Sequence, residues 1–166
     1  ELDDCTVSSN RGDGVIWADR AHANLTSCVL GNNGVHGDPQ SEEGSLASGI
    51  AISMNASCRP TSVTLDGNEG SGVNMTPHDL FAEILVTDLY DDNPDVVPHL
   101  VSTDCRFEDN GVAGIEVDQS GELDLDDCVL TGNGFAGIHL DGYACGYVGG
   151  WREGADYVCH PVEAID

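Results

Sequence analysis

Two neighbouring segments of the chain, 103–118 and 126–141, repeat one pattern of residue types. Cys105 and Cys128 stand 23 residues apart, and in each copy an Asn follows the Cys after five residues and a Gly follows that Asn after four. A repeat of this length is typical of a solenoid, in which each repeat forms one coil and stacks on its neighbours. We therefore expect the chain to fold as a stack of similar coils.

The same pattern recurs in the N-terminal half of the chain, with two interruptions. The polar stretch at about 37–48 and the stretch at about 77–99 separate copies that otherwise keep the spacing, so we interpret both as insertions into the coils. Residues 78–90 fit either a short amphipathic helix or an extra pair of strands. The residues at the Cys place are Cys5, Cys28, Val63, Cys105 and Cys128, and those at the Asn place are Asn10, Asn33, Asn68, Asn110 and Asn133.

Apolar and polar residues alternate after each Gly of the repeat. Ile115 and Val117, for example, are separated by Glu116, and the other copies alternate in the same way. This period of two predicts strands with one buried face. Stacking such strands about 4.8 Å apart buries that face and places equivalent residues in columns. One of these columns would consist of Asn side chains that hydrogen-bond from coil to coil.

The pattern resembles the right-handed parallel β-helix of the pectin-lyase-like superfamily, above all in the Asn-x-x-x-Gly-Ile sequence at 110–115 and 133–138. This resemblance covers about residues 2–142. It implies an all-β, single-stranded right-handed parallel β-helix, and 166 residues suffice for about five to six coils. We expect coils at residues 1–142 and a C-terminal segment at 143–166 that either caps the coils or docks on another molecule.

The charge balance is extreme and excludes two classes of partner. The chain has 30 acidic residues, five Arg and no Lys, which gives a formal net charge of −25. Nucleic acids and anionic membrane surfaces are therefore excluded, because little positive charge is available to neutralise phosphates. No apolar run is long enough for a membrane span. High solubility or a saline habitat explains the acidity without a specific cationic ligand.

Several features indicate export from the cell. Glu1 falls within a repeat and no signal peptide is present, so we interpret the chain as a processed or excised piece of a secreted precursor. Three N-glycosylation sequons begin at Asn24, Asn55 and Asn74. The alternation places Asn24 and Asn74 on the solvent side of strands and Asn55 in a connection. We therefore expect an extracellular or cell-surface protein carrying N-linked glycans.

Seven cysteines in an exported chain suggest disulfides. The pair that we favour is Cys145 with Cys159, on either side of a Gly-rich stretch. In the coils two interpretations stay open: disulfides between neighbouring coils, or a column of small reduced side chains that act as hydrophobic residues. The disulfide candidates in the coils are Cys5 with Cys28 and Cys105 with Cys128, which leaves Cys58 as a buried thiol or a link to another chain.

Catalytic signals are incomplete. Lyases on this fold use an Arg or Lys base, and Arg106 is the only such residue near an acidic coil. Residues 76–79, Thr-Pro-His-Asp, resemble the Asp-Pro-His-Asp motif of mannuronan C5-epimerases, but Thr76 replaces the first Asp and Val73 stands at the preceding Tyr place. An ordinary turn explains the same residues, so no catalytic residue is assigned.

Acidic residues on the outward face of the last two coils form a second candidate site. In the expected register Glu116 stacks on His139, and Asp118 stacks on Asp141. Like charges at this separation repel unless a cation relieves them, and Ca²⁺ prefers such oxygen ligands. A calcium site at Glu116, Asp118 and Asp141 is therefore one hypothesis, and a solvated acidic face is the other. No further cofactor is required.

The function that these features favour is structural. We expect a non-enzymatic, secreted, N-glycosylated β-helix that joins head to tail with copies of itself in a filament or surface layer, because an uncapped coil exposes strand edges and apolar residues. The other explanation of the uncapped coil is an excised fragment whose missing coils cover it. One alternative is a lyase or C5-epimerase acting on uronate polysaccharide. The other is a carbohydrate-binding or adhesin module.

Overall fold

The structure is a computed structural model of the chain, and it describes residues 1–18, 20–34, 47–53, 55–76, 98–117 and 121–140, with the backbone of 145–148 and 158–159. These residues contain strands and no helix, so they include no apolar helical segment that could span a bilayer. In chain order the strands are β1 (Leu2–Asp3), β2 (Thr6–Ser8), β3 (Val15–Trp17), β4 (His22–Thr26), β5 (Val29–Gly31), β6 (Ile50–Ser53), β7 (Ser57–Thr61), β8 (Thr64–Asp66), β9 (Val73–Thr76), β10 (His99–Thr103), β11 (Arg106–Glu108), β12 (Ala113–Val117), β13 (Glu122–Asp126), β14 (Val129–Thr131), β15 (Ala136–Leu140), β16 (Cys145–Val148) and β17 (Val158–Cys159).

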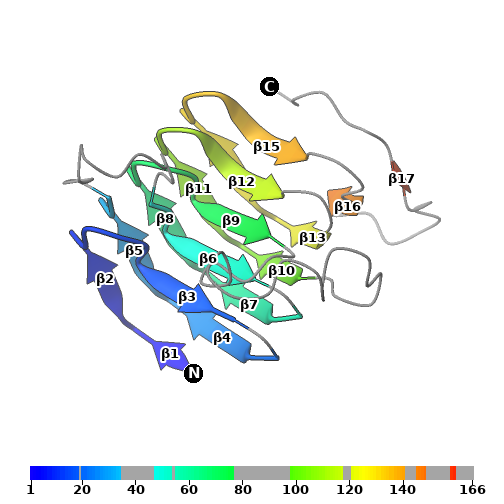
Figure 1. The fold of residues 1–166 in the computed structure, drawn as a ribbon, viewed down its shortest axis with the longest axis horizontal. Helices are drawn as coiled ribbons and strands as arrows, with labels where there is room; N and C mark the ends of the chain where they lie inside the picture. Colours follow the sequence, from blue (N-terminus) through cyan, green and yellow to red (C-terminus); the bar gives the residue numbers. More distant parts are fainter. Residues whose placement is uncertain are drawn as a thin grey trace, which may run out of the picture.

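The strands form three sheets that run the length of the stack (Figure 1). Sheet A has the order β1-β4-β7-β10-β13-β16-β17, sheet B the order β2-β5-β8-β11-β14, and sheet C the order β3-β6-β9-β12-β15. Each coil contributes one strand to each sheet in turn, and the neighbours are parallel except for β16 and β17. This arrangement confirms the predicted parallel β-helix, with five coils described from β1 to β15.

The register between coils follows the 23-residue repeat. Arg106 lies beside Val129 and Ile115 lies beside Ile138, as the pattern predicts. The coils resume at once after the second insertion, because His99, which we had assigned to that insertion, is the first residue of β10 and pairs with Glu122. Most of both insertions lies outside the described residues. Sheet A also extends past residue 142, because β16 pairs in parallel with β13.

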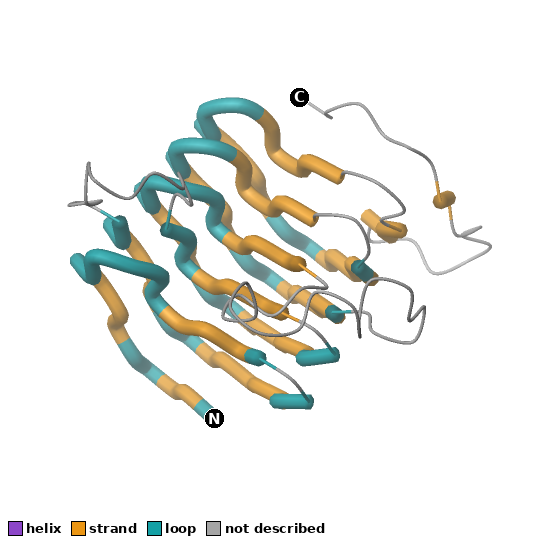
Figure 2. Tube along the Cα trace, in the orientation of Figure 1, coloured by secondary structure: helices purple, strands orange, loops and turns teal. Residues whose placement is uncertain are grey.

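Two corners in each coil have left-handed backbone conformations, and equivalent corners stack on one another (Figure 2). Asp, Asn and Gly accept this conformation more readily than other residues, and they occupy most of these places. The corner before the Cys place is formed by Asp4, Ser27, Ser62, Asp104 and Asp127, and the corner before the Asn place by Ser9, Asn32, Gly67, Asp109 and Gly132. The sharp turns that close each coil therefore come from residue types visible in the repeat.

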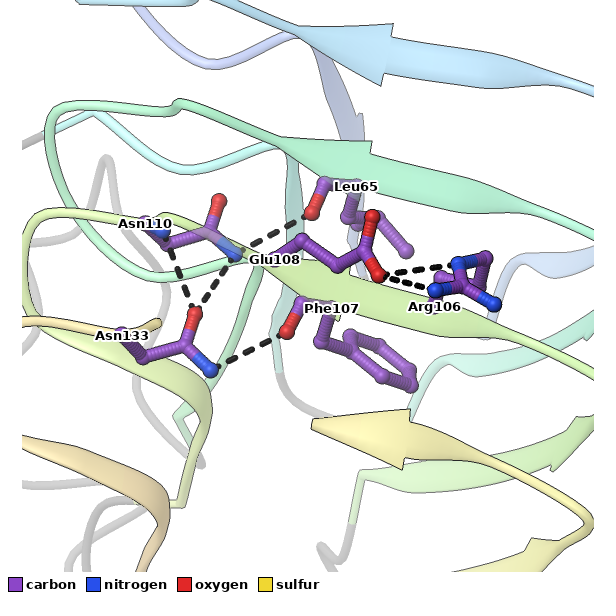
Figure 3. Close-up of polar contacts among 6 residues, drawn as sticks. All are labelled: Leu65, Arg106, Phe107, Glu108, Asn110 and Asn133. Atoms are coloured by element: carbon purple, nitrogen blue, oxygen red, sulfur yellow. Dashed lines mark hydrogen bonds and ion pairs between the residues drawn. The ribbon is translucent and has the colours of Figure 1, made fainter. Parts of the chain in front are cut away.

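The predicted column of Asn side chains is present next to the second corner. In the first four coils, Nδ2 of the Asn donates to Oδ1 of the Asn in the following coil at 2.9 to 3.0 Å, from Asn10 to Asn133. Each Oδ1 also accepts the backbone N–H of the preceding Asn. The remaining Nδ2 proton goes to a backbone carbonyl of the preceding coil, as from Asn133 to Phe107 at 3.0 Å (Figure 3). The buried amides thus fix the coil-to-coil register and satisfy their own hydrogen-bonding groups.

The core consists of apolar columns that face inward from all three sheets. In the middle of the stack these side chains have no exposed surface, as at Leu65, Phe107 and Ile115. One column passes through the Cys places, and Val63 lies in it between Cys28 and Cys105, as the backbone hydrogen bonds of their neighbours show. Each coil therefore buries its apolar residues against the coils on both sides.

The Gly column has a steric cause. A Cβ on Gly72 would lie 2.6 Å from the carbonyl oxygen of Gly114 and 3.1 Å from Nδ2 of Asn110 in the next coil. Gly14, Gly49 and Gly114 have equivalent short approaches. The Asn-x-x-x-Gly spacing is therefore one structural unit, because the missing side chain leaves room for the next coil and its Asn.

We predict that Gly72→Ala destabilises the protein by about 1–3 kcal/mol, because the added methyl group forces two coils apart. Gly12→Ala is the matched control: no atom lies within 4 Å of a Cβ there, and its effect should stay within about 0.5 kcal/mol. The free energy of unfolding, measured by chemical denaturation, tests the difference. Equal effects of the two substitutions would contradict the steric explanation.

Candidate functional site

The first coil presents an incompletely covered set of apolar side chains. Its strands β1, β2 and β3 are the edge strands of sheets A, B and C. The side chains of this coil pack against the core but stay half-buried, whereas their equivalents one coil later are at most 1% exposed. The half-buried residues are Leu2, Cys5, Val7, Val15 and Trp17, and their equivalents in the second coil are Leu25, Cys28, Leu30, Ile50 and Ile52.

At the opposite end of the stack, sheet A ends differently from sheets B and C. Strands β14 and β15 are the edges of sheets B and C, with Leu130 and Leu140 half-buried and Phe135 58% exposed. Sheet A continues to β17, which pairs antiparallel with β16 so that Cys145 lies opposite Cys159. Opposite residues of an antiparallel pair have Cα atoms within the range that a disulfide requires. The Cys145–Cys159 disulfide stays a prediction, supported by this backbone register.

The Asn column has a direction, so its two ends differ. Asn10 donates to Asn33, and no described residue donates to Oδ1 of Asn10. At the other end Asn133 accepts from Asn110 and donates to the Phe107 carbonyl, and its second Nδ2 proton has no described acceptor. One end therefore presents an acceptor and the other a donor.

The five described cysteines are free thiols in this structure. Cys5 with Cys28 and Cys105 with Cys128 stack on adjacent coils with no disulfide between them in this structure, and disulfide formation in these pairs stays a hypothesis. Cys58 has no exposed surface, which supports the interpretation as a buried thiol. A link to another chain would require the side chain to be accessible in the folded state.

Burial, and the contact between Cys105 and Cys128, shift the pKa values of these thiols in different directions. Burial raises the pKa of Cys58 to about 12. A hydrogen bond from Cys105 lowers the pKa of Cys128 to about 7, although burial opposes the shift, and the same contact raises the pKa of Cys105. We assign the lower pKa to Cys128 because it is half-buried and Cys105 is fully buried.

The three sequons differ in accessibility. Asn24 is exposed on β4 and Asn55 is exposed in the turn before β7, as predicted from the register. Asn74 faces outward on β9 but is half-buried between Ala51 and Glu116 of the adjacent coils. The glycosylation itself stays a prediction.

The acidic candidate is only partly described, since Asp118 and Asp141 lie outside the described residues. Glu116 stacks beside His139 as predicted, with 3.5 Å between His139 Nδ1 and Glu116 Oε1. The other carboxylate oxygen of Glu116 accepts a hydrogen bond from the Ser71 hydroxyl at 2.8 Å. Among the described residues, no group of three or more His, Cys, Asp or Glu is arranged to hold a metal ion. The calcium site stays a hypothesis.

The lyase candidate Arg106 is engaged within its own strand. Its guanidinium donates to Oε1 of Glu108 (Figure 3), and this hydrogen bond raises the pKa of Arg106 above its ordinary value. A catalytic base needs the opposite shift, because it must lose its proton near neutral pH. Residues 77–79 of the epimerase-like segment lie outside the described residues.

One polar cluster was not predicted. On the outward face of sheet A, Nδ1 of His22 lies 2.6 Å from Oγ of Ser57, and Nδ1 of His99 lies 2.9 Å from Oε2 of Glu122. These residues begin four successive strands of sheet A. Applying the repeat to polar positions as well as apolar ones would have placed His99 beside Glu122 from sequence, 23 residues apart.

The family model described as the right handed beta helix region matches residues 1–148 of the chain. The chain therefore belongs to the right-handed β-helix family, which agrees with the resemblance found in its repeats. No curated protein and no solved structure is similar enough to provide a further comparison. Because this fold supports many functions, the function has to be argued from the sites themselves.

Alkylation tests the assignment of the thiols. At about pH 7.5 we expect iodoacetamide to modify Cys128 at least about tenfold faster than Cys58, because only Cys128 is both partly accessible and largely thiolate. Peptide mass spectrometry gives the two rates, and protein unfolded in guanidinium, where the rates should converge, is the control. If a Cys105–Cys128 disulfide forms, Cys128 reacts only after reduction. Equal rates in the folded protein would contradict the assignment.

Proposed function

We propose that this protein is a secreted structural subunit that assembles head to tail with copies of itself, the open first coil of one molecule receiving the C-terminal end of the next. The observation that carries the proposal is the difference between the first two coils. Equivalent apolar side chains are half-buried in the first coil and at most 1% exposed in the second. A coil stacked on Val7, Val15 and Trp17 would complete their burial.

The edges of the stack support a directional contact. Strands β2 and β3 at one end and β14 and β15 at the other are the edges of sheets B and C. Their backbone groups can pair across a molecular junction in the parallel arrangement found between coils. The Asn column adds a matched pair, since Asn133 offers a donor and Asn10 an acceptor. Contact between these unlike surfaces propagates into a filament unless rotation closes a ring.

Sheet A requires a different contact at the junction. Its C-terminal edge is β17 rather than a parallel coil strand, because β16 already lies on β13. In the proposed assembly, the segment containing β16 and β17 lies against β1 of the next molecule. This use of the C-terminal segment is the docking role that the sequence left open beside capping.

The sides of the helix suit exposure to solvent. Asn24, Asn55 and Asn74 lie on the sides of coils two and three, between the two end coils. Glycans at these positions would leave the ends free to join. The net charge of −25 keeps neighbouring filaments apart, and added salt screens this repulsion.

Substitution of an end residue tests the assembly. Val7→Asp places a charge among the apolar side chains that the next molecule covers, and we expect it to abolish concentration-dependent polymers. Ser8→Asp is the matched control, because the adjacent residue of β2 is exposed on the side of the helix and should tolerate the same charge. Analytical ultracentrifugation and negative-stain microscopy report polymer size.

A mixing experiment separates loss of assembly from loss of folding. Folded Val7→Asp protein keeps an intact C-terminal end, so small amounts of it should block growth at the filament end that exposes a first coil and shorten wild-type filaments. Circular dichroism checks the fold of both variants. Wild-type protein that stays monomeric at high concentration, or Val7→Asp protein that polymerises normally, would overturn the proposal.

Enzymatic deglycosylation of protein from an exporting eukaryotic host tests the sequons. We expect glycans to be released from exposed Asn24 and Asn55 in the folded protein, and from half-buried Asn74 only after unfolding. Peptide mass spectrometry detects the Asn-to-Asp conversion that accompanies release. An intact mass equal to that of the bare polypeptide would reject glycosylation altogether.

A further inference from the structure

A column of four polar residues lies on the outward face of sheet A, on the side of the helix, from the second coil to the fifth. His22, Ser57, His99 and Glu122 each begin one strand, in β4, β7, β10 and β13 respectively. The strands are in register, so His22 lies beside Ser57, Ser57 beside His99, and His99 beside Glu122. The parallel register brings these side chains to about one strand spacing from each other.

The column contains a nucleophile in contact with a base. Nδ1 of His22 lies 2.6 Å from Oγ of Ser57, so the Ser57 hydroxyl can donate its proton to the imidazole. This contact is the arrangement that activates serine for attack, and imidazole is the base most often used. His22 is exposed and Ser57 is half-buried, so a substrate in solution can reach both.

The other side of Ser57 carries an oriented histidine. Glu122 Oε2 lies 2.9 Å from Nδ1 of His99, so the Nδ1–H group can donate to the carboxylate and fix the orientation of the ring. Arg59 projects from the same face of β7 two residues after Ser57, is exposed, and has no carboxylate partner among the described residues. An exposed guanidinium two residues from the serine stands out in a chain with only five Arg and 30 acidic residues. Arg59 can stabilise negative charge that develops on a substrate oxygen.

We propose that Ser57 is the nucleophile of an acyl-transfer site, with His22 as general base, and that the site hydrolyses carboxylic esters of small acyl groups. Ser57 Oγ attacks the ester carbonyl as His22 takes its proton, and Arg59 stabilises the oxyanion. The carbon–oxygen bond to the alcohol then breaks, and the alcohol leaves with the proton from His22. Water attacks the acyl-serine as His22 takes one of its protons. The bond between the acyl carbon and Ser57 Oγ then breaks, and His22 gives the proton to Ser57 Oγ as the acid leaves.

His22 and Arg59 are exposed on the outward face of sheet A, close to the sequon residues Asn24 and Asn55. In protein without glycans at these positions, an ester carried on a polymer or on a small aryl alcohol can approach this face. This inference does not depend on the assembly proposed above, because the column is on the side of the helix. Loss of polymerisation therefore leaves the expected chemistry unchanged.

Covalent labelling tests the nucleophile directly. Full-length protein from a bacterial host, in which Asn55 carries no glycan, is treated with a fluorophosphonate, and the modified serines are mapped by mass spectrometry. We expect Ser57 to react at least about a hundredfold faster than Ser62, an exposed serine whose hydroxyl donates to Asp104 at 2.8 Å and has no imidazole partner. Hydrolysis of p-nitrophenyl acetate gives the catalytic readout.

Variants separate catalysis from a simple surface hydrogen bond. Ser57→Ala should lose both label and esterase activity, and His22→Gln should slow the labelling of Ser57 about a hundredfold, because it removes the base. Arg59→Gln should slow ester hydrolysis less than either of these, because the nucleophile and its base remain in place. Ser62→Ala is the control and should behave as the wild type. Labelling of Ser57 at the rate of Ser62, or an unchanged rate in His22→Gln, would overturn the proposal.

Discussion

Backbone hydrogen bonding between successive coils is the interaction on which the whole structure depends. A single coil has too few apolar residues to bury a core of its own, so each coil is stable only when its neighbours pair with its strands and cover its side chains. The Asn column links the backbone ladder to the core, because each amide bonds to the backbone as well as to the next Asn. An unsatisfied buried amide group would cost about 1–3 kcal/mol, so the column tolerates few substitutions.

This dependence on neighbours explains why the ends and the sides of the helix suit different functions. In the middle coils every strand has a partner above and below, and residues such as Leu65 and Ile115 are fully buried. In the first coil one partner is absent among the described residues, and Trp17 and Val15 stay half-buried. The ends therefore offer backbone edges and apolar area. The sides instead offer regular columns of polar groups about one strand spacing apart.

The side columns combine residues that are distant in the chain. His22 and Ser57 are 35 residues apart, yet the register places them in hydrogen-bonding contact. The same register brings Glu116 beside both Ser71 and His139. A stack of coils can thus build a chemical site from one residue per coil without changing its core, since alternate residues of each strand face outward.

The sequence by itself determined the fold, because the residues that define it recur at a fixed spacing. Asn110 and Asn133, Cys105 and Cys128, and the alternation after each Gly were enough to predict the sheets, their parallel order and their register. Only the tertiary structure decided which side chains of coils on either side of an insertion come into contact. The contact between His22 and Ser57, the complete burial of Cys58 and the half-burial of Asn74 arise from stacking across those insertions. Linear spacing is lost wherever extra residues loop out, whereas strand pairing restores the columns in space.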